Sequence, residues 1–458
     1  MANVSKTGAL APQLPKSLRL KVEYREVDSL QPYTGNARTH SDKQIEQIAA
    51  SIRQFGFTNP VLIDGANSIV AGHGRVAAST KLGLSEVPVI KLAHLSDAER
   101  RAYVIADNRL AELAGWDNEI LAIELQALSN MDLDFDLEIT GFETAEIDLL
   151  LDDDANYHDP ADDVHEPVPG PAITQPGDVW HLGRHKLICG DAQDANTYRM
   201  LMEDERARAV FTDPPYNVKI DGHVCGSGKV RHREFAMASG EMDKSGFTAF
   251  LRDALAAMAD VSLDGAIHFV CMDWRHMDEL SAAGDGIYSE LKNLVVWAKT
   301  NGGMGTFYRS RHELVFVYKV GTAKHLNNFG LGETGRYRTN VWDYPGVNSF
   351  GGNQEDLALH PTVKPVTLVA DAIRDVTRRG DIVLDGFGGS GTTLIAAERT
   401  GRVTRMIELD PLYCDVVCRR FEALTGKPAI LDGSDQTFND VEVERADEMA
   451  AKIVEAAE

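Results

Sequence analysis

The sequence predicts an α/β protein in which a doubly wound, helix-covered parallel sheet follows a smaller, separate α+β domain. Seven apolar β-like runs alternate with helical stretches after residue 177, and this alternation is typical of parallel sheets covered by helices. The runs are residues 186–189, 209–212, 266–271, 294–298, 314–319, 382–384 and 403–407. An Asp- and Pro-rich stretch without a hydrophobic period, residues 152–177, indicates a linker before them. A chain of 458 residues is long enough to bury two cores.

The pattern divides the chain into five segments. We expect a flexible arm over residues 1–20, a first domain over 21–127, an acidic helix and linker over 128–176, a second domain over 177–430 and an acidic tail over 431–458. Within the first domain, Ser41 followed by Gln44 predicts the start of a helix. A turn separates the β-like runs 60–63 and 68–71, and residues 96–125 are expected to be helical.

Composition places the chain among ordinary globular proteins, with 43% hydrophobic and 25% charged residues. No run approaches the roughly 18 uninterrupted apolar residues of a membrane span, and the polar start lacks a signal pattern, so we expect a cytoplasmic protein without membrane contact. The five cysteines are scattered, with neither a C-x-x-C pair nor a His cluster at metal spacing, and we expect no metal. Cys414 and Cys418, four residues apart on a predicted helix, are the alternative metal or redox pair.

The formal charge of −24 argues against a surface coated in basic residues, because cations placed on phosphates supply much of the affinity for nucleic acids. The acidic residues gather in residues 132–163 and 435–458, away from the two motifs that carry chemistry. Since net charge describes the average surface, it leaves room for a basic cleft.

The first motif is Asp213-Pro214-Pro215-Tyr216, which follows the apolar run 209–212 where a strand delivers its carboxyl end. Ligands bind at such ends in open α/β sheets. The carboxylate of Asp213 and carbonyls fixed by two prolines can together accept both hydrogens of one amine, which aims the nitrogen lone pair at an electrophile. Tyr216 offers a flat face for stacking a base that has left the duplex. Taken alone, the motif is also compatible with an ordinary turn.

The second motif is a glycine-rich turn, Asp385-Gly386-Phe387-Gly388-Gly389-Ser390-Gly391-Thr392, between an apolar run and a predicted helix. Such a turn forms a cradle in which the backbone approaches a nucleotide or cofactor closely. Glu408, about 20 residues further on, has the spacing of a carboxylate that binds ribose hydroxyls. Any ribose-bearing cofactor fits this pattern, so a nicotinamide-binding fold is the competing interpretation.

In this order along the chain, the motifs resemble those of the DNA amino-methyltransferases of the N6-adenine/N4-cytosine type, in the motif order of the β class. The resemblance extends over residues 177–424 and includes Gly190-Asp191 and His360-Pro361-Thr362-Val363-Lys364-Pro365. It implies a seven-stranded methyltransferase sheet, S-adenosylmethionine as cofactor, and methyl transfer to the exocyclic amine of a flipped base in double-stranded DNA. The implied catalytic residues are Asp213, Pro214, Pro215 and Tyr216. The implied cofactor-binding residues are Asp191, Lys364, Pro365, Asp385, Phe387, Gly389, Gly391, Thr392 and Glu408.

The resemblance also implies the target atom. An aspartate at the first position of the amine-binding motif goes mainly with adenine in this family, and a serine with cytosine N4, so Asp213 implies adenine N6. Cytosine N4 remains the alternative. Gly386 stands where the family often has proline, at a position that varies. The reaction asks the protein for orientation, desolvation and a proton acceptor, and it needs no metal.

Two regions have the composition of a DNA-contacting surface. Residues 320–359 lose the βα rhythm and are rich in Gly, Asn, Tyr and Arg, and the resemblance places target recognition there. Residues 221–243 form a basic loop beside the amine motif, although a solvated surface loop fits them equally well. The expected DNA-binding residues are Lys229, Arg231, Arg309, Arg311, Arg336 and Arg338.

The first domain resembles the ParB-like domain of chromosome-partitioning proteins, through Asn59-Pro60-Val61-Leu62-Ile63 and Val70-Ala71-Gly72-His73-Gly74-Arg75-Val76-Ala77-Ala78. The resemblance implies a phosphate or nucleotide site at Gly72, His73, Gly74 and Arg75, where small residues lead into a predicted helix beside an arginine. A structural loop, or a domain that only contacts DNA or a partner, fits these residues too. The oligomeric state stays open, with a homodimer as one option.

The leading interpretation is a site-specific DNA methyltransferase, as in restriction–modification systems, with an added ParB-like module. One alternative is a nucleotide-regulated DNA-binding protein whose methyltransferase domain is secondary or degenerate. Another is methyl transfer to RNA or to a protein amide. The intact pair of motifs argues against the first alternative, and the long polar, aromatic and basic insert favours duplex DNA over the second.

Overall fold

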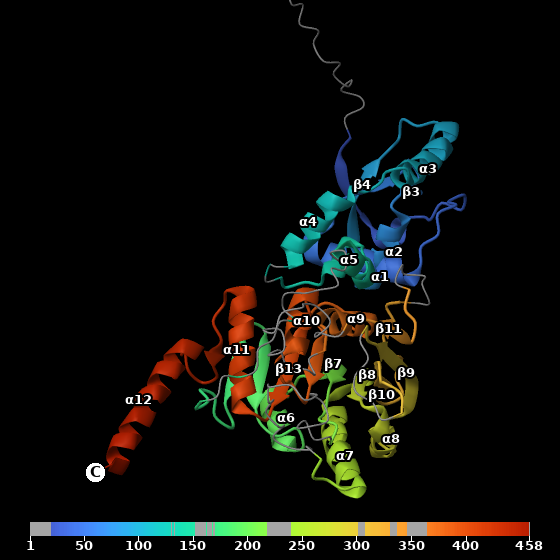
Figure 1. Ribbon diagram of the computed structural model, residues 1–458. Helices are drawn as coiled ribbons and strands as arrows, with labels where there is room; N and C mark the ends of the chain where they lie inside the picture. Colours follow the sequence, from blue (N-terminus) through green and yellow to red (C-terminus); the bar gives the residue numbers. More distant parts are fainter. Residues whose placement is uncertain are drawn as a thin grey trace, which may run out of the picture. The chain divides into compact units, whose positions relative to one another are not determined.

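The computed structural model describes residues 20–129, 131, 133–151, 162, 167, 170–217, 240–300, 307–329, 337–345 and 364–457. In the last helix the side chains are described up to residue 447. Backbone contacts divide the chain into two units, Met1–Glu143 and Thr144–Glu458 (Figure 1). Each unit has its own sheet and its own hydrophobic core.

The amino-terminal unit is an α+β domain built on a four-stranded sheet in the order β1-β4-β2-β3. The strands are β1 Val22–Glu26, β2 Val61–Ile63, β3 Ile69–Ala71 and β4 Glu86–Lys91. The helices are α1 Asp42–Phe55, α2 His73–Leu82, α3 Asp97–Glu112 and α4 Asn118–Ser129, with short 3-10 turns η2 Val27–Ser29 and η3 Leu137–Thr140. Buried valine and isoleucine side chains of β2, β3 and β4 form the core.

Local sequence signals set the ends of these helices. The Ser41 side chain accepts a hydrogen bond from the backbone N–H of Gln44 at 3.2 Å, so α1 begins where the sequence predicts. Ser96 and Glu99 form a complete capping box at the start of α3. The stretch expected to be helical over residues 96–125 is instead two helices, because the chain leaves the helix around Gly115, and glycine is a poor helix former.

The second unit is built on a mixed sheet of ten strands among its described residues, in the order β11-β9-β10-β8-β7-β12-β13-β6-β5-β14. They are β5 Val179–Leu182, β6 His185–Cys189, β7 Ala207–Thr212, β8 Ser262–Met272, β9 Glu290–Ala298, β10 His312–Lys319, β11 Val341–Asp343, β12 Ile382–Asp385, β13 Val403–Glu408 and β14 Ile430–Leu431. Neighbouring strands from β8 through β7, β12 and β13 to β6 run parallel. The seven predicted strands are all present, and the short β5, β11 and β14 extend the sheet beyond them.

Helices cover both faces of this sheet, which confirms the doubly wound α/β class (Figure 1). The helices of this unit are α5 Thr144–Leu150, α6 Ala195–Met202, α7 Lys244–Asp260, η5 Trp274–His276, α8 Met277–Gly284, α9 Val366–Val376, α10 Thr392–Thr400, α11 Pro411–Thr425 and α12 Phe438–Ala457. Successive residues of β7 mark the two faces, because side chains alternate along a strand. Val210 packs in one core with Phe250 of α7, whereas Phe211 packs in the other with Ile373 of α9.

The chain reverses its winding between β7 and β12. Strand β7 leads through α7 to β8 on one side, whereas β12 leads through α10 to β13 on the other. Open α/β sheets bind ligands in the crevice outside the carboxyl ends of the strands at such a reversal. Both predicted motifs begin there, because Asp213 directly follows β7 and Asp385 is the last residue of β12.

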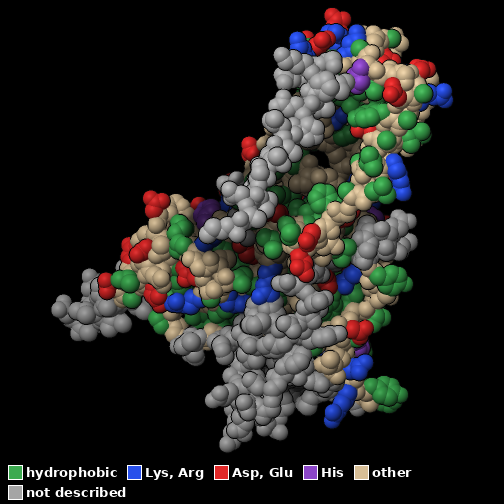
Figure 2. All heavy atoms as spheres, turned by 90° about the horizontal axis from the view of Figure 1, so that it is seen from above, with side chains coloured by type: hydrophobic (Ala, Val, Ile, Leu, Met, Phe, Trp, Pro, Cys, Tyr) green, Lys and Arg blue, Asp and Glu red, His purple; other side chains and the backbone are tan. Residues whose placement is uncertain are grey.

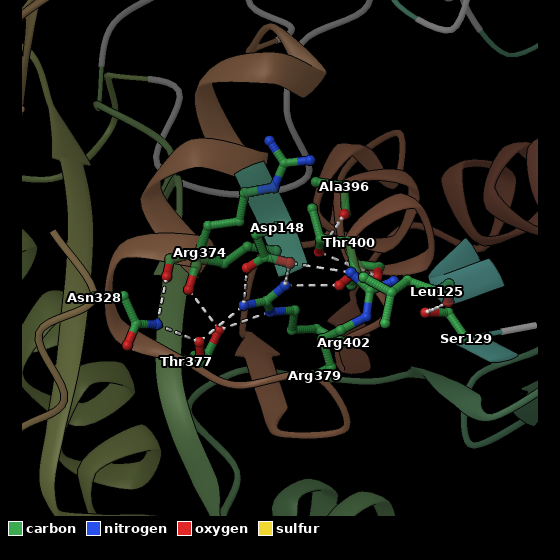
Figure 3. A network of polar contacts seen from close by, with 12 residues as sticks. Leu125, Ser129, Asp148, Asn328, Arg374, Thr377, Arg379, Ala396, Thr400 and Arg402 are labelled. Atoms are coloured by element: carbon green, nitrogen blue, oxygen red, sulfur yellow. Dashed lines mark hydrogen bonds and ion pairs between the residues drawn. The ribbon is translucent and has the colours of Figure 1, made fainter. Parts of the chain in front are cut away.

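A buried ion network fastens α5 to the second unit (Figure 3). Asp148 is 1% exposed, and its two oxygens accept hydrogen bonds from the Arg402 guanidinium at 2.9 and 2.8 Å. Arg379 donates a third at 3.0 Å, and Arg402, itself fully buried, also donates to the carbonyls of Thr377 and Thr400. Burial alone would raise the pKa of Asp148, but the guanidiniums outweigh it and hold that pKa below its usual value.

Replacing Asp148 by alanine should lower the free energy of unfolding by about 3–5 kcal/mol, because the buried Arg402 loses its counter-charge. Denaturant unfolding of the full chain measures the change. The control, Asp278→Ala, removes an exposed carboxylate 3.9 Å from Lys244 and should cost less than about 1 kcal/mol. If the two substitutions lowered the free energy of unfolding equally, the Asp148 network would stabilise the protein no more than an exposed ion pair does.

Candidate active site

The first motif forms a polar centre at the end of β7. Asp213 Oδ1 accepts a hydrogen bond from the Tyr216 hydroxyl at 2.6 Å, and Asp213 Oδ2 lies 2.5 Å from Lys364 Nζ. Tyr216 packs against the cores on both faces of the sheet, and Pro214, next to Asp213, is buried. The motif therefore presents one carboxylate whose two oxygens are each held by a donor.

Charged residues from three further segments complete this centre. Lys364 is 5% exposed, and its Nζ lies 3.0 Å from Glu313 Oε2 and 3.3 Å from the Tyr216 hydroxyl oxygen. Glu313, on β10, also forms an ion pair with Lys299, which follows β9. The resemblance placed Lys364 at the border of the cofactor site. In the structure its ammonium lies on the amine-binding motif, while Pro365 precedes the first turn of α9.

Burial and charge pull the pKa values of these groups in opposite directions. Burial raises the pKa of Asp213, and the Lys364 ammonium opposes that increase. Burial would also raise the pKa of Glu313, but Lys364 and Lys299 outweigh it and lower this pKa to about 2. For Lys364 burial disfavours the charge, yet the carboxylates of Asp213 and Glu313 outweigh it, and the net effect is a raised pKa. The centre thus contains two carboxylates and two ammonium groups, whose formal charges cancel.

The second motif is a turn in which the backbone passes very close to the neighbouring strand. Gly389 and Gly391 have φ values of +50° and +87°, a left-handed backbone that favours glycine. A Cβ on Gly388 would lie 2.4 Å from Cγ of the buried Met406 and 3.2 Å from the carbonyl oxygen of Ile407. The glycines therefore allow the turn to lie flat against β13.

Asp385 lies beneath this turn, 4% exposed. Its Oδ1 accepts hydrogen bonds from Thr212 Oγ1 at 2.9 Å and from the Phe387 N–H at 3.0 Å, and its Oδ2 accepts one from Thr393 Oγ1 at 2.7 Å. Burial raises the pKa of Asp385 to about 6. The resemblance implied a cofactor contact for this residue. The hydrogen bonds that it makes tie the end of β7 to the glycine turn and to α10.

Two carboxylates stand beside the turn, at the ends of the next parallel strands. Glu408 ends β13, and its oxygens accept hydrogen bonds from the N–H groups of Gly389 at 2.7 Å and Asp410 at 2.8 Å. Burial raises the pKa of Glu408 to about 7. Asp191 follows β6, and its Oδ1 accepts a hydrogen bond from the Gln193 N–H at 2.9 Å. A carboxylate oxygen accepts more than one hydrogen bond, so both groups can also bind hydroxyls or an amine of a cofactor.

The remaining cofactor candidates flank the turn. Phe387 is half-buried, with its ring centre 5.8 Å from that of Phe250. Thr392 is the first residue of α10. Around these residues the protein offers an aromatic surface, backbone N–H groups at a helix start and two carboxylates, which together suit a ribose-bearing cofactor.

Three of the predicted DNA-binding residues, Arg309, Arg311 and Arg338, lie among the described residues. Arg309 and Arg311 are exposed just before β10, beside the exposed Phe307 and Tyr308. Figure 2 shows acidic and basic side chains interspersed on the face that it draws. Lys229, Arg231 and Arg336 lie outside the described residues, as do residues 218–239 and 346–363.

Arg338 is engaged inside the second unit. Its Nε lies 3.0 Å from Asp375 Oδ2, and its Nη1 lies 3.4 Å from Asp371 Oδ2. Its guanidinium carbon lies 4.9 Å from the ring centre of Trp342, and 15% of the side chain is exposed. These contacts fasten the segment around β11 to α9.

The amino-terminal unit has a cavity of about 220 Å³ at the start of α2, lined among others by Gly72, His73, Gly74 and Arg75. Gly72 has a φ of +102°, and a Cβ on Gly74 would lie 3.0 Å from Ile48 Cδ1. The Nε atom of Arg75 is buried without a hydrogen-bond partner among the described residues. Burial lowers the pKa of His73, so its ring is neutral at pH 7. The predicted residues thus share one hollow with an unsatisfied donor.

Other groups that the sequence singled out are structural. Cys414 and Cys418 are fully buried free thiols in the core beneath α11. Among the described residues, no group of three or more His, Cys, Asp or Glu side chains is arranged to hold a metal. The part of the chain that the structure describes also has no helix long and apolar enough to cross a membrane.

Family models match three stretches of the chain. The DNA methylase model matches residues 207–419, the ParB N-terminal domain model matches residues 17–109, and the ParB-methyltransferase HTH domain model matches residues 119–176. The last stretch includes the segment expected to be an acidic helix and linker, and it contains η3, α5 and all of α4 except its first residue.

Individual relatives agree with this division. The chain is 52% identical over 85 residues to the ParB-like nuclease domain-containing protein YnaK of Escherichia coli K12, a match that covers 19% of this chain and 98% of YnaK. It is 27% identical over 276 residues to the type II methyltransferase M2.DpnII of Streptococcus pneumoniae, covering 56% of this chain and 95% of that protein. Among solved structures, the cytosine-N4-specific PvuII DNA methyltransferase aligns with a TM-score of 0.40 and 17% identity, over 57% of this chain and 91% of that one.

The doubly wound sheet, the paired motifs and these matches define a DNA-modifying transferase with an added amino-terminal module. The chain carries a DNA methylase domain of the N6-adenine/N4-cytosine type, joined to a ParB-type amino-terminal domain. Both parts of the predicted resemblance are confirmed, and so is DNA methylation as the function.

Sequence reasoning missed Glu313 and Lys299. The signal for Glu313 lay in the alternation along β10, where it shares a strand face with Val315 and Val317. A carboxylate on a face turned toward the core requires a cationic partner. The partner, Lys364, is 51 residues away, so only the folded chain shows which lysine it is.

Gly388→Ala should destabilise the protein by about 1–3 kcal/mol, because the new methyl group must displace the buried Met406 side chain. Thermal unfolding of the full chain measures the loss. Gly170→Ala is the control, since its added methyl group meets no atom within 4 Å. An unchanged unfolding temperature for Gly388→Ala would contradict the close approach of the turn to β13.

Proposed function

We propose that the protein transfers a methyl group from S-adenosylmethionine to the exocyclic N6 amine of an adenine flipped out of duplex DNA. One observation carries the proposal: Asp213 and the glycine turn stand at adjacent strand ends that the Thr212–Asp385 hydrogen bond joins. An amine acceptor and a cofactor cradle therefore share one crevice. The family match supports DNA as the substrate, and the aspartate at the first motif position supports adenine over cytosine.

S-adenosylmethionine is the cofactor, and when bound it supplies an electrophilic methyl group on a sulfonium. Glu408 and Asp191 would accept hydrogen bonds from its ribose hydroxyls and its adenine amine, since both keep acceptor capacity. Gly389 and Gly391 let the backbone approach, and the Phe387 ring offers an apolar surface. Pro365 and Thr392 border this cradle at the starts of α9 and α10.

The chain's own part in the reaction is to orient the amine and to take up its proton. Asp213 and the carbonyls of the Pro214-Pro215 turn accept the two amine hydrogens, which points the nitrogen lone pair out of the base plane. Tyr216 stacks on the flipped base. Asp213 is also the group that takes the amine proton, because burial raises its pKa and so makes its carboxylate a stronger base.

DNA contacts are proposed for the exposed segment before β10. Arg309 and Arg311 can bind phosphates, and the exposed rings of Phe307 and Tyr308 beside them can stack on bases. Lys229, Arg231 and Arg336 remain candidates for the same role, whereas Arg338 acts first through its ion pairs with Asp371 and Asp375. With chromosomal DNA as substrate, the enzyme acts in the cytoplasm.

Incubation of the purified protein with mixed-sequence duplex DNA and methyl-labelled S-adenosylmethionine, followed by nucleoside analysis, tests the function. We expect label in N6-methyladenine and a loss of more than about 100-fold in Asp213→Ala, which lacks the amine acceptor. The control, Asp278→Ala, should keep wild-type activity because its carboxylate is exposed. Label in N4-methylcytosine would overturn the base assignment. An absence of label from every DNA tested would overturn the function.

We also propose that the amino-terminal unit binds a nucleoside triphosphate in the cavity at the start of α2. The cavity is lined by the N-terminal backbone of a helix, by the Arg75 guanidinium and by the glycines Gly72 and Gly74. The unsatisfied Nε of Arg75 supports an anionic ligand.

Equilibrium dialysis of the full-length protein against ATP, GTP, CTP and UTP tests this second activity. We expect binding of at least one nucleotide and about a tenfold or greater weakening in Arg75→Ala, which removes a charge-assisted donor. The exposed Arg53 of α1 supplies the control, and Arg53→Ala should bind as the wild type does. Failure of all four nucleotides to bind would show that the cavity is structural.

A further inference from the structure

Glu313 has no part in the proposed reaction, yet it lies at the amine site. We infer that Glu313 is a positioning residue that shares the Lys364 ammonium with Asp213, so that Lys364 keeps Asp213 charged while a lone pair of that carboxylate stays free for the amine. This inference rests on the proposed function. According to this inference, Lys364 belongs to the amine-binding centre, and its ion pair with Glu313 sets the position of its ammonium group.

The three hydrogens of the Lys364 ammonium have three acceptors. They are Asp213 Oδ2 at 2.5 Å, Glu313 Oε2 at 3.0 Å and the Tyr216 hydroxyl oxygen at 3.3 Å. An ammonium group has three donors and no acceptor, so this arrangement uses its full capacity. With one direction fixed on Glu313, the ammonium can give Asp213 only one hydrogen bond.

Removal of Glu313 would change how Lys364 engages Asp213. Without its second carboxylate, the buried ammonium would be drawn fully to Asp213, and the lone pairs that the amine needs would be occupied. Glu313 is itself held in place by its ion pair with Lys299, whose ammonium lies 4.4 Å from the ring centre of Trp297. Glu313 and Asp213 therefore share the Lys364 ammonium, and this sharing limits how strongly the ammonium binds Asp213.

A competing role for Glu313 is to receive the amine proton through Tyr216, whose hydroxyl lies 3.2 Å from Glu313 Oε2. The pKa values argue against it, because that of Glu313 is lowered to about 2 whereas that of Asp213 is raised. As the methylated amine loses its proton, the N–H bond breaks, its electron pair stays on nitrogen, and the proton passes to an oxygen of Asp213. Glu313 remains charged throughout.

Other titratable groups also face Asp213. Cys271 on β8 and Asp385 on β12 interact with it electrostatically, and burial raises the pKa of both, that of Asp385 to about 6. Cys271 is therefore neutral at pH 7. Among the charged groups near Asp213, Lys364 and Glu313 can be altered without touching the hydrogen bonds of the glycine turn.

The pH profile of kcat/KM for DNA methylation tests the inference, because its acid limb reports the ionisation of Asp213. Lys364→Met removes the neighbouring cation, so the pKa of Asp213 rises and the acid limb should move to higher pH by about one unit or more. Glu313→Gln removes a neighbouring negative charge, so the acid limb should move to lower pH. The plateau rate of Glu313→Gln should fall about 10- to 100-fold, because Lys364 is no longer aimed.

Matched variants separate positioning from general damage. Glu290→Gln alters an exposed carboxylate on β9 and should leave both the limb and the plateau unchanged. Glu313→Asp keeps the charge and should recover part of the plateau rate. Shifts of the acid limb in the same direction for Lys364→Met and Glu313→Gln would overturn the inference, and so would a wild-type profile for Glu313→Gln.

A second measurement keeps the inference testable if the wild type methylates no DNA, the outcome that would sink the proposed function. The folded-state pKa of Glu313 is lowered, so its charge stabilises the protein above the unfolded value near 4.3 and ceases to do so as the pH falls toward about 2. The unfolding temperature of Glu313→Gln should therefore lie below that of the wild type at pH 6, and the difference should shrink by pH 3. A constant difference would contradict a charged Glu313 in this centre.

Discussion

The hydrogen bond between Thr212 and Asp385 is the interaction on which the site depends. It joins the ends of the two strands between which the chain reverses its winding, and the same carboxylate binds the glycine turn and the start of α10. A buried carboxylate is costly unless donors surround it, so these contacts are obligatory for the fold and not incidental to it. One side chain therefore holds the first motif and the glycine turn next to each other.

The carboxylate of Asp213, the proposed amine acceptor, presents the opposite problem, because its proposed role requires it to be sheltered from water and still carry charge. Burial favours the neutral form of Asp213, and the Lys364 ammonium beside it favours the charged form. Lys364 is also paired with Glu313. Replacing a buried ion pair by well-packed apolar residues is often neutral or stabilising, so a gain in stability alone does not account for this group. The proposed role of Asp213 in methyl transfer therefore accounts for the cost of burying these charges, whereas the stability of the fold does not.

The sequence was sufficient for the parts of the fold that local patterns determine. Alternating apolar runs predicted the seven main strands, and glycine spacing predicted the turn after β12. The strands β11 and β14, of three and two residues, carry too few residues for a pattern, and each pairs with a longer strand at an edge of the sheet. The direction of Lys364 and the pairing of Arg338 with Asp375 were equally beyond reach, since each joins residues that only the strand order brings together.

The Asp148 network also bears on how such a fusion could have arisen. Helix α5 is fastened through Asp148 to Arg402 and Arg379, so it belongs to the second unit, although the family model that spans it begins in the first. Recombination that exchanged the amino-terminal module ahead of Thr144 would leave this anchor intact. A breakpoint after Leu150 would remove Asp148 and leave Arg379 and Arg402 without their counter-charge. An exchange of the amino-terminal module that preserves the second unit therefore has its boundary before α5, upstream of the acidic linker.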